Sequence, residues 1–163
     1  TVQLLGSGVI LREVIKAAKI LRDEYQIHSN VWSVTSFNEL RRDGLDVEHY
    51  NRMHPEEEPR QSYVSQQLQH SVGPIIAATD YMRLYADQIR PYIKNHYVTL
   101  GTDGYGRSDT RERLRHFFEV DAKFIVLAAL EALVEEGKLD KKALSEAIKK
   151  YAIKADKPNP LHV

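Results

Sequence analysis

Four short apolar segments, each followed by a turn and then by a helical pattern, constrain the fold of this chain more than any other feature. They span residues 2–5, 31–34, 74–79 and 97–100. Strands that alternate with helices lie parallel in one sheet and are joined by right-handed crossovers. The order therefore predicts an α/β fold of three layers, in which a mainly parallel sheet carries helices on both faces.

The second apolar segment places Val31, Trp32 and Val34 almost in succession. Such continuous apolar runs are typical of strands that are covered on both faces, as in the interior of a parallel sheet. We therefore expect this strand to be buried on both sides.

Residues that cap or stop helices mark the segments between the strands. Ser36, followed three residues later by Glu39, has the pattern of a capping box. Gly44 is the expected stop of that helix, and a second helical piece is expected over residues 45–54. Further helices are expected over residues 10–25, 63–68, 81–90, 111–118, 122–134 and 141–151, with Asp80, Asp121 and Asp140 as caps of three of them. The helix over residues 122–134 has few polar positions, so we expect it to pack on its own sheet.

The chain is long enough to form one compact domain without disulfides or metals. It has 163 residues, of which 42% are hydrophobic, and no cysteine, which fits a cytoplasmic protein. Its 23 basic and 23 acidic residues balance, so net charge gives no argument for binding nucleic acid or a membrane surface. We expect a single domain over residues 1–163. Because the sequence starts directly in a strand and without methionine, we also expect a fragment of a longer subunit.

The segment over residues 100–111 is the main candidate for a functional site. Three glycines follow the last strand, and Ser108 or Asp109 then offers a side-chain oxygen to cap a helix, with Glu112 as the partner in a capping box. A strand, a glycine turn and a helix start together present backbone N–H groups at the carboxyl end of a sheet, where α/β folds bind ligands. Glycine turns of this kind also join strands to helices in proteins that bind nothing there.

Asp80 and Tyr81 follow the third strand as the glycine loop follows the fourth. Because the ends of parallel strands meet at one edge of a sheet, side chains from these two loops are expected to converge there. The expected crevice or interface consists of Asp80, Tyr81, Asp103, Arg107, Ser108 and Asp109. Arginines lie among the two aspartates of the loop, so a salt-bridged turn explains Asp103 and Asp109 at least as well as acid–base catalysis does.

Known phosphate motifs do not match this loop. A P-loop needs a lysine after its second glycine, and no lysine occurs between Lys94 and Lys123. The dinucleotide fingerprint G-x-G-x-x-G, started at Gly104, puts Asp109 in the third glycine's place. The magnesium and thiamine diphosphate motif needs Gly-Asp-Gly, whereas Thr102 precedes the aspartate here. The sequence therefore predicts no complete active site.

Several longer phrases together resemble one protein family. They are residues 33–40 (SVTSFNEL), 78–82 (ATDYM) and 100–109 (LGTDGYGRSD), supported by shorter matches within residues 41–44, 54–60 and 118–121. These phrases resemble the C-terminal domain of the homodimeric bacterial pyruvate dehydrogenase first component, and the resemblance covers about residues 4–160. It implies a transketolase-like C-terminal fold, whose sheet often includes one antiparallel strand.

The resemblance also implies a function for the parent enzyme. That enzyme oxidatively decarboxylates pyruvate with thiamine diphosphate and magnesium, then transfers the acetyl group to the lipoyl arm of an acetyltransferase component. In this family the cofactor ligands belong to the two preceding domains, so no catalytic, cofactor-binding or metal-binding residue is carried over to this chain. The implied role of the chain is structural and in dimerisation, without a cofactor of its own. Its implied partners are the N-terminal and middle domains, a second subunit and the acetyltransferase component.

A remaining apolar surface of the domain is then expected to face the other domains or the second subunit.

Two other functions stay open at this point. A regulatory module would bind an anion such as a phosphate metabolite in the crevice; it is motivated by Arg107, Arg111, Arg113 and Arg115, although a basic helix is usually a solvated face. A transketolase proper would share the fold but is not expected to carry these phrases together.

Overall fold

A computed structural model describes residues 1–163, and its centre is a sheet of four parallel strands. The strands are β1 (Val2–Gly6), β2 (Ser29–Ser33), β3 (Ile75–Ala78) and β4 (Tyr97–Leu100), in the spatial order β2-β1-β3-β4. In the register, Leu4 of β1 lies opposite Val31 on one side and Ile76 on the other. All three strand pairs are parallel, so the sheet has no antiparallel strand.

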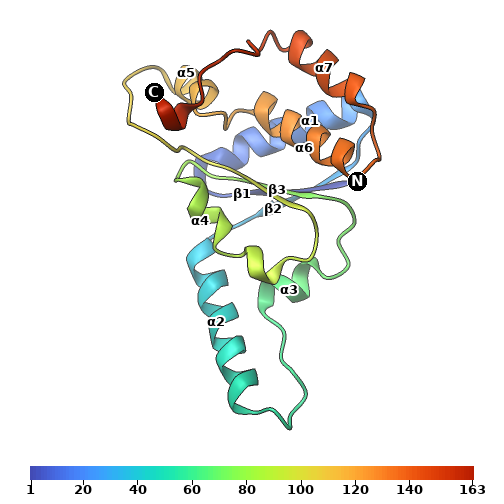
Figure 1. Ribbon diagram of the computed structural model, residues 1–163, viewed down its shortest axis with the longest axis vertical. Coiled ribbons are helices and arrows are strands. Elements are labelled where there is room, and N and C mark those ends of the chain that lie inside the picture. Colours follow the sequence, from blue (N-terminus) through green and yellow to red (C-terminus); the bar gives the residue numbers. More distant parts are fainter.

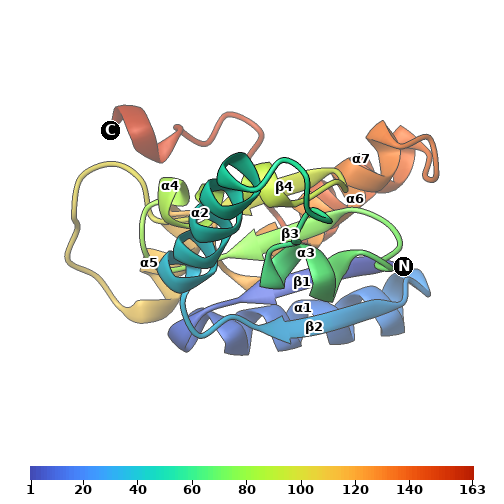
Figure 2. The same cartoon turned by 90° about the horizontal axis from the view of Figure 1, so that it is seen from below.

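Helices cover both faces of the sheet, as Figure 1 shows. They are α1 (Leu11–Tyr25), α2 (Phe37–Met53), α3 (Tyr63–Leu68), α4 (Arg83–Asp87), α5 (Arg111–Phe117), α6 (Ala122–Glu135) and α7 (Lys141–Lys150), with short 3-10 turns η1 (Gly8–Ile10), η2 (Arg90–Tyr92) and η3 (Pro160–His162). Helices α1 and α6 lie on one face with α7 beyond them, while α2, α3 and α4 lie on the other (Figures 1 and 2). The prediction of a three-layer α/β fold is confirmed.

The alternation of side chains along the strands divides the interior into two cores. Leu4 and Ile76 point into the core shared with α1 and α6, whereas their neighbours Leu5 and Ile75 point into the core shared with α2, α3 and α4. Successive strand residues face opposite sides of a sheet, so a central strand with both faces covered buries its residues on both sides. Accordingly, all five residues of β1 are buried.

Helix α6 joins the first core as predicted. The Asp121 carboxylate accepts a hydrogen bond from the amide of Phe124 at 3.0 Å and so caps the helix. Eight of its residues are buried, because α6 packs against α1, α7 and the strands β3 and β4. No helix in the chain has both the length and the apolarity needed to cross a membrane.

The prediction that the second strand is covered on both faces is wrong. Strand β2 lies at the edge of the sheet, pairs only with β1, and leaves Val31 41% exposed. Trp32 is half-buried, and its indole N–H donates to the Oε1 atom of Gln3 on β1 at 2.9 Å. The apolar run is therefore real, but its position in the sheet depends on the order of the strands, which a local pattern does not contain.

The predicted stop at Gly44 is also wrong, because α2 runs without a break from Phe37 to Met53. Its start is as predicted, with the amide of Glu39 donating to Ser36 Oγ at 3.2 Å. Gly44 is buried against the ring of Tyr92, and a Cβ atom at this position would lie 2.3 Å from that ring. Glycine thus serves the close packing of α2 on η2 here and does not end the helix.

Candidate functional site at the carboxyl end of the sheet

The loops that follow β3 and β4 lie side by side at the carboxyl end of the sheet. The amide of Thr102 donates to the carbonyl of Tyr81 at 2.8 Å, and the Thr102 hydroxyl donates to the carbonyl of Asp80. Gly101 makes this approach possible, because a Cβ atom there would lie 2.7 Å from the Tyr81 carbonyl oxygen. The structure therefore brings the Asp80–Tyr81 segment and the start of the glycine loop together.

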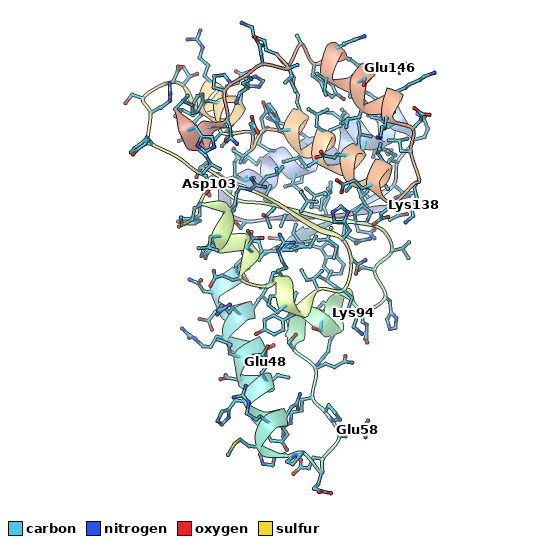
Figure 3. All side chains as sticks on the ribbon, in the orientation of Figure 1. Glu48, Glu58, Lys94, Asp103, Lys138 and Glu146 are labelled. Carbon is cyan, nitrogen blue, oxygen red and sulfur yellow. The ribbon has the colours of Figure 1, made fainter.

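Asp103 belongs to the same contact region, and Figure 3 labels it beside the start of α4. Its Oδ1 atom accepts a hydrogen bond from the amide of Arg83, the first residue of α4, at 3.0 Å. The Arg83 side chain in turn donates to the carbonyl of Thr99 at 3.0 Å. Asp103 thus acts as a helix cap supplied from a neighbouring loop.

This arrangement corrects the prediction that Asp80 caps a helix over residues 81–90. Helix α4 spans only Arg83–Asp87, and its N-cap residue, Met82, provides no side-chain cap. The exposed Asp80 side chain makes no hydrogen bond within the chain, because the cap position starts two residues later than predicted. A cap that comes from a different loop leaves no signal in the local sequence.

Arg107, Ser108 and Asp109 lie in a second group, on the far part of the glycine loop. The guanidinium of Arg107 lies over the ring of Phe117, 4.1 Å from its centroid. All three residues line an open hollow of about 340 Å³ together with Arg113, Leu114 and Phe117. No hydrogen bond or ion pair connects this group to Asp80, Tyr81 or Asp103, so the six predicted residues divide into two separate groups.

The cap of α5 also differs from the prediction. Thr110 is the N-cap residue, and its hydroxyl accepts from the amide of Arg113 at 3.4 Å. Asp109 instead accepts from the amide of Thr110 at 2.7 Å, and its pairing with Glu112 in a capping box is therefore wrong. The helix begins one residue later than such a box requires.

Three of the four arginines that motivated an anion site already have partners within the chain. Arg107 lies over Phe117, Arg113 lies 3.8 Å from the carboxylate of Asp109, and Arg115 donates to the Oε1 atom of Glu13 at 3.1 Å. A guanidinium that is paired with a carboxylate is a weaker anion receptor than a free one. The geometry does not favour the regulatory alternative.

Glu13 is a buried carboxylate that the sequence analysis missed. Its side chain is 7% exposed and accepts three hydrogen bonds, from Lys16, Arg115 and the amide of Ala122. It thereby joins α1 to α5 and to the first turn of α6. Its spacing of four from Ala17 on the buried face of α1 is the signal that could have revealed it.

A second polar contact lies at the ends of the two central strands. The Ser7 hydroxyl donates to Thr79 Oγ1 at 3.0 Å, and the amide of Tyr81 donates to the same oxygen at 3.2 Å. Ser7 and Thr79 are both buried. These bonds fix the loop after β3 against the turn after β1.

The C-terminal segment packs against the end of α5 and against the glycine loop. The Lys157 ammonium donates to the carbonyl of Phe117 at 2.8 Å and to the carboxylate of Glu119 at 3.0 Å. Gly104 has φ +99°, and a Cβ atom there would lie 2.1 Å from the carbonyl oxygen of Pro160. The tail therefore packs directly on the glycine loop, and both positive φ and close contact require glycine at position 104.

The residues of this site do not fit a magnesium diphosphate group. No three His, Asp or Glu side chains in the chain lie close enough together to hold a metal ion. The two aspartates of the loop bind different backbone amides: Asp103 caps α4, and Asp109 accepts from the amide of Thr110. Both carboxylates order the backbone at this end of the sheet.

Comparisons with known proteins agree with this fold. The sequence profile described as "Transketolase-like TK C-terminal domain" matches residues 1–121. The chain is 60% identical over 161 residues to the "Pyruvate dehydrogenase E1 component" of Pseudomonas aeruginosa and 54% identical over 160 residues to that of Escherichia coli K12. In both cases the match covers 98% of this chain and 18% of the relative, so the chain spans about a fifth of the length of these relatives.

A solved structure titled "Split gene transketolase, inactive beta4 tetramer" shares the fold. The TM-score is 0.56 with 17% sequence identity, and the match covers 82% of this chain and 39% of that one. The profile matches well over half of the chain, and the relatives cover nearly all of it. The chain belongs to the transketolase-like C-terminal domain family.

Proposed function

We propose that this chain is the C-terminal domain of a longer subunit, the first component of a pyruvate dehydrogenase. The parent enzyme oxidatively decarboxylates pyruvate and transfers the acetyl group to the lipoyl arm of an acetyltransferase component. The observation that carries this proposal is the 60% identity to a pyruvate dehydrogenase E1 component over 98% of the chain. The chain covers 18% of that relative, so most of the enzyme's residues lie outside it.

Within that enzyme, the domain supports the structure and the dimer and holds no cofactor. The support is that two carboxylates are used within the chain: Asp103, in the loop after β4, holds the amide of Arg83, and Glu13 on α1 holds Arg115. Thiamine diphosphate and magnesium belong to the parent enzyme, with their ligands in the preceding domains. The partners are those domains, a second subunit and the acetyltransferase component, in the cytoplasm.

A calorimetric titration tests this assignment. The 163-residue chain and the full-length parent are each titrated with magnesium and thiamine diphosphate. We expect tight binding to the parent and none to the chain, together with pyruvate decarboxylation by the loaded parent alone. Stoichiometric binding to the chain would overturn the scaffold role, and a full-length parent that does not turn over pyruvate would overturn the enzyme assignment.

A further inference from the structure

Exposed apolar side chains gather at the carboxyl end of the sheet. Tyr81 is 63% exposed, Met82 55%, Leu84 65%, Tyr105 80% and Leu161 47%. We name these five residues the strand-end surface. The other large exposed apolar side chains, apart from Val9 and Val163, are distributed over α1, α2, α3, β2 and the loop before β3: Ile15, Val31, Leu45, Met53, Tyr63 and Val72. Scattered apolar residues are ordinary on a protein surface, whereas a cluster marks an interaction site.

The three segments that carry the strand-end surface pack against one another. The amide of Thr102 bonds to the carbonyl of Tyr81, which joins the loop after β3 to the loop after β4. Gly104 lies against the backbone of Pro160 and Leu161, which joins the glycine loop to the tail. The three segments are therefore neighbours in the folded chain, although they are distant in the sequence. Figure 2 shows the glycine loop and the C-terminus at the same end of the sheet.

Hydrogen bonds hold the backbone of this surface in place. Asp103 fixes the amide of Arg83, between Met82 and Leu84, and Thr79 fixes the amide of Tyr81. Lys157, whose side chain is only 16% exposed, anchors the tail to the carbonyl of Phe117. A surface that is ordered before binding loses less conformational entropy when a partner docks. For Tyr81, Met82 and Leu84, ordered backbone beneath exposed apolar side chains is the arrangement expected of a docking face.

We propose that the strand-end surface docks against the remaining domains of the same polypeptide. This inference rests on the proposed function, in which the chain is one domain of a longer subunit. The chain spans 18% of its relatives, so roughly four fifths of such a polypeptide lies outside it. Domains joined in one chain meet at high effective concentration. Docking of an apolar face on a domain of the same chain is therefore favoured over docking on a separate molecule.

Photo-crosslinking in the full-length parent tests the occupant of this surface. A benzophenone amino acid replaces Tyr105, whose side chain is 80% exposed. Isotope-labelled and unlabelled subunits are mixed, and mass spectrometry locates the crosslinks. We expect crosslinks from position 105 to residues outside this domain, within the same isotopic copy. Crosslinks that join the two isotopic copies would overturn the proposal in favour of a second subunit, and the absence of crosslinks would overturn docking altogether.

Paired substitutions separate docking from folding. Leu84→Gln and Tyr105→Ser change the strand-end surface, while Leu45→Gln and Tyr63→Ser make the same chemical changes at exposed positions on α2 and α3. We expect the first pair to increase amide hydrogen exchange over residues 79–84 and 101–106 of the full-length protein at least tenfold, and the second pair to leave it unchanged. Equal exchange in both pairs would overturn the proposal. Neither this exchange nor the crosslinks depend on pyruvate turnover, so they report on docking even if the enzyme assignment fails.

Discussion

The carboxylate of Glu13 accepts a hydrogen bond from the backbone amide of Ala122 at 3.1 Å, although 109 positions separate the two residues. Ala122 is the first residue of α6, and the first amides of a helix have no partner within the helix. The same carboxylate also receives Arg115 from α5. One buried acid on α1 thus fixes the start of α6 and the end of α5.

Replacing Glu13 by alanine is expected to lower the free energy of unfolding by about 2–4 kcal/mol. The substitution leaves a partly buried guanidinium and a buried amide without their acceptor. Glu13→Gln should cost less, because its remaining oxygen still accepts one bond. Urea denaturation of the 163-residue chain measures both, with the exposed Glu146→Ala on α7 as the control. A loss for Glu13→Ala no greater than that of the control would contradict the role given to this carboxylate.

Alanine at position 44 is expected to destabilise the chain by about 1–3 kcal/mol, because its Cβ would collide with the ring of Tyr92. At an exposed helix interior the same change would stabilise by about 0.5–1 kcal/mol. The sign of the change in thermal or urea stability therefore distinguishes close packing from ordinary helix propensity. In the double variant Gly44→Ala/Tyr92→Ala the ring is absent, so adding the Cβ at position 44 should destabilise the chain less than it does in the presence of Tyr92. Stabilisation by the single change would refute the packing explanation.

Asp103→Ala is expected to cost about 1–2 kcal/mol of stability, the usual loss for a helix cap. Asp103→Asn keeps an oxygen that can accept from the amide of Arg83 and should recover most of it. The matched control is Asp80→Ala, since the Asp80 carboxylate caps nothing and is exposed. Hydrogen exchange at the amide of Arg83 reports the cap directly. Equal losses for Asp103→Ala and Asp80→Ala would show that the cap contributes nothing.

Alkaline pH is expected to destabilise the fold through Tyr97. Burial raises the pKa of this hydroxyl above its ordinary value of about 10, and the hydroxyl donates to the carbonyl of Ala86 at 2.8 Å. Because the folded pKa is the raised one, the contribution is fully present below about pH 10 and is lost as pH rises beyond it. Tyr97→Phe should cost about 1 kcal/mol at pH 7, and this difference should shrink above pH 10.

The measurement is urea denaturation of the wild-type chain and Tyr97→Phe between pH 7 and 11. The wild type should lose up to about 1.4 kcal/mol more than the variant for each pH unit above the unfolded value. Stability curves that stay parallel across this range would exclude Tyr97 as the cause.

The strands and most helix starts could be predicted because their signals are local. Ser36, Asp121 and Asp140 each cap the helix that follows them, and in each case the accepting oxygen and the donating amide lie within three residues. The predictions that were wrong concern contacts between residues that are distant in the sequence. Gly44 is explained by Tyr92, and the start of α4 by Asp103, each brought close only by the folded chain.

The candidate site was predictable to the same extent. Parallel neighbouring strands must end at one edge, which was enough to place Asp103 beside the segment that contains Asp80 and Tyr81. The position of Arg107 was not predictable from the strands, because a long loop lets its guanidinium reach the ring of Phe117. The strand positions therefore predict the location of only the first residues of each loop.

The strand order has a consequence for how the chain is made. Strand β1 is synthesised first, yet it occupies the interior of the sheet and pairs with β3, so that Leu5 lies opposite Ala77. Until the ribosome has released α2, α3 and then β3, one edge of this strand, whose residues are all buried in the folded chain, has no neighbour. Nascent chains therefore pass through a period in which a strand that is fully buried in the folded chain can still pair with other chains, and unpaired strand edges of this kind promote aggregation.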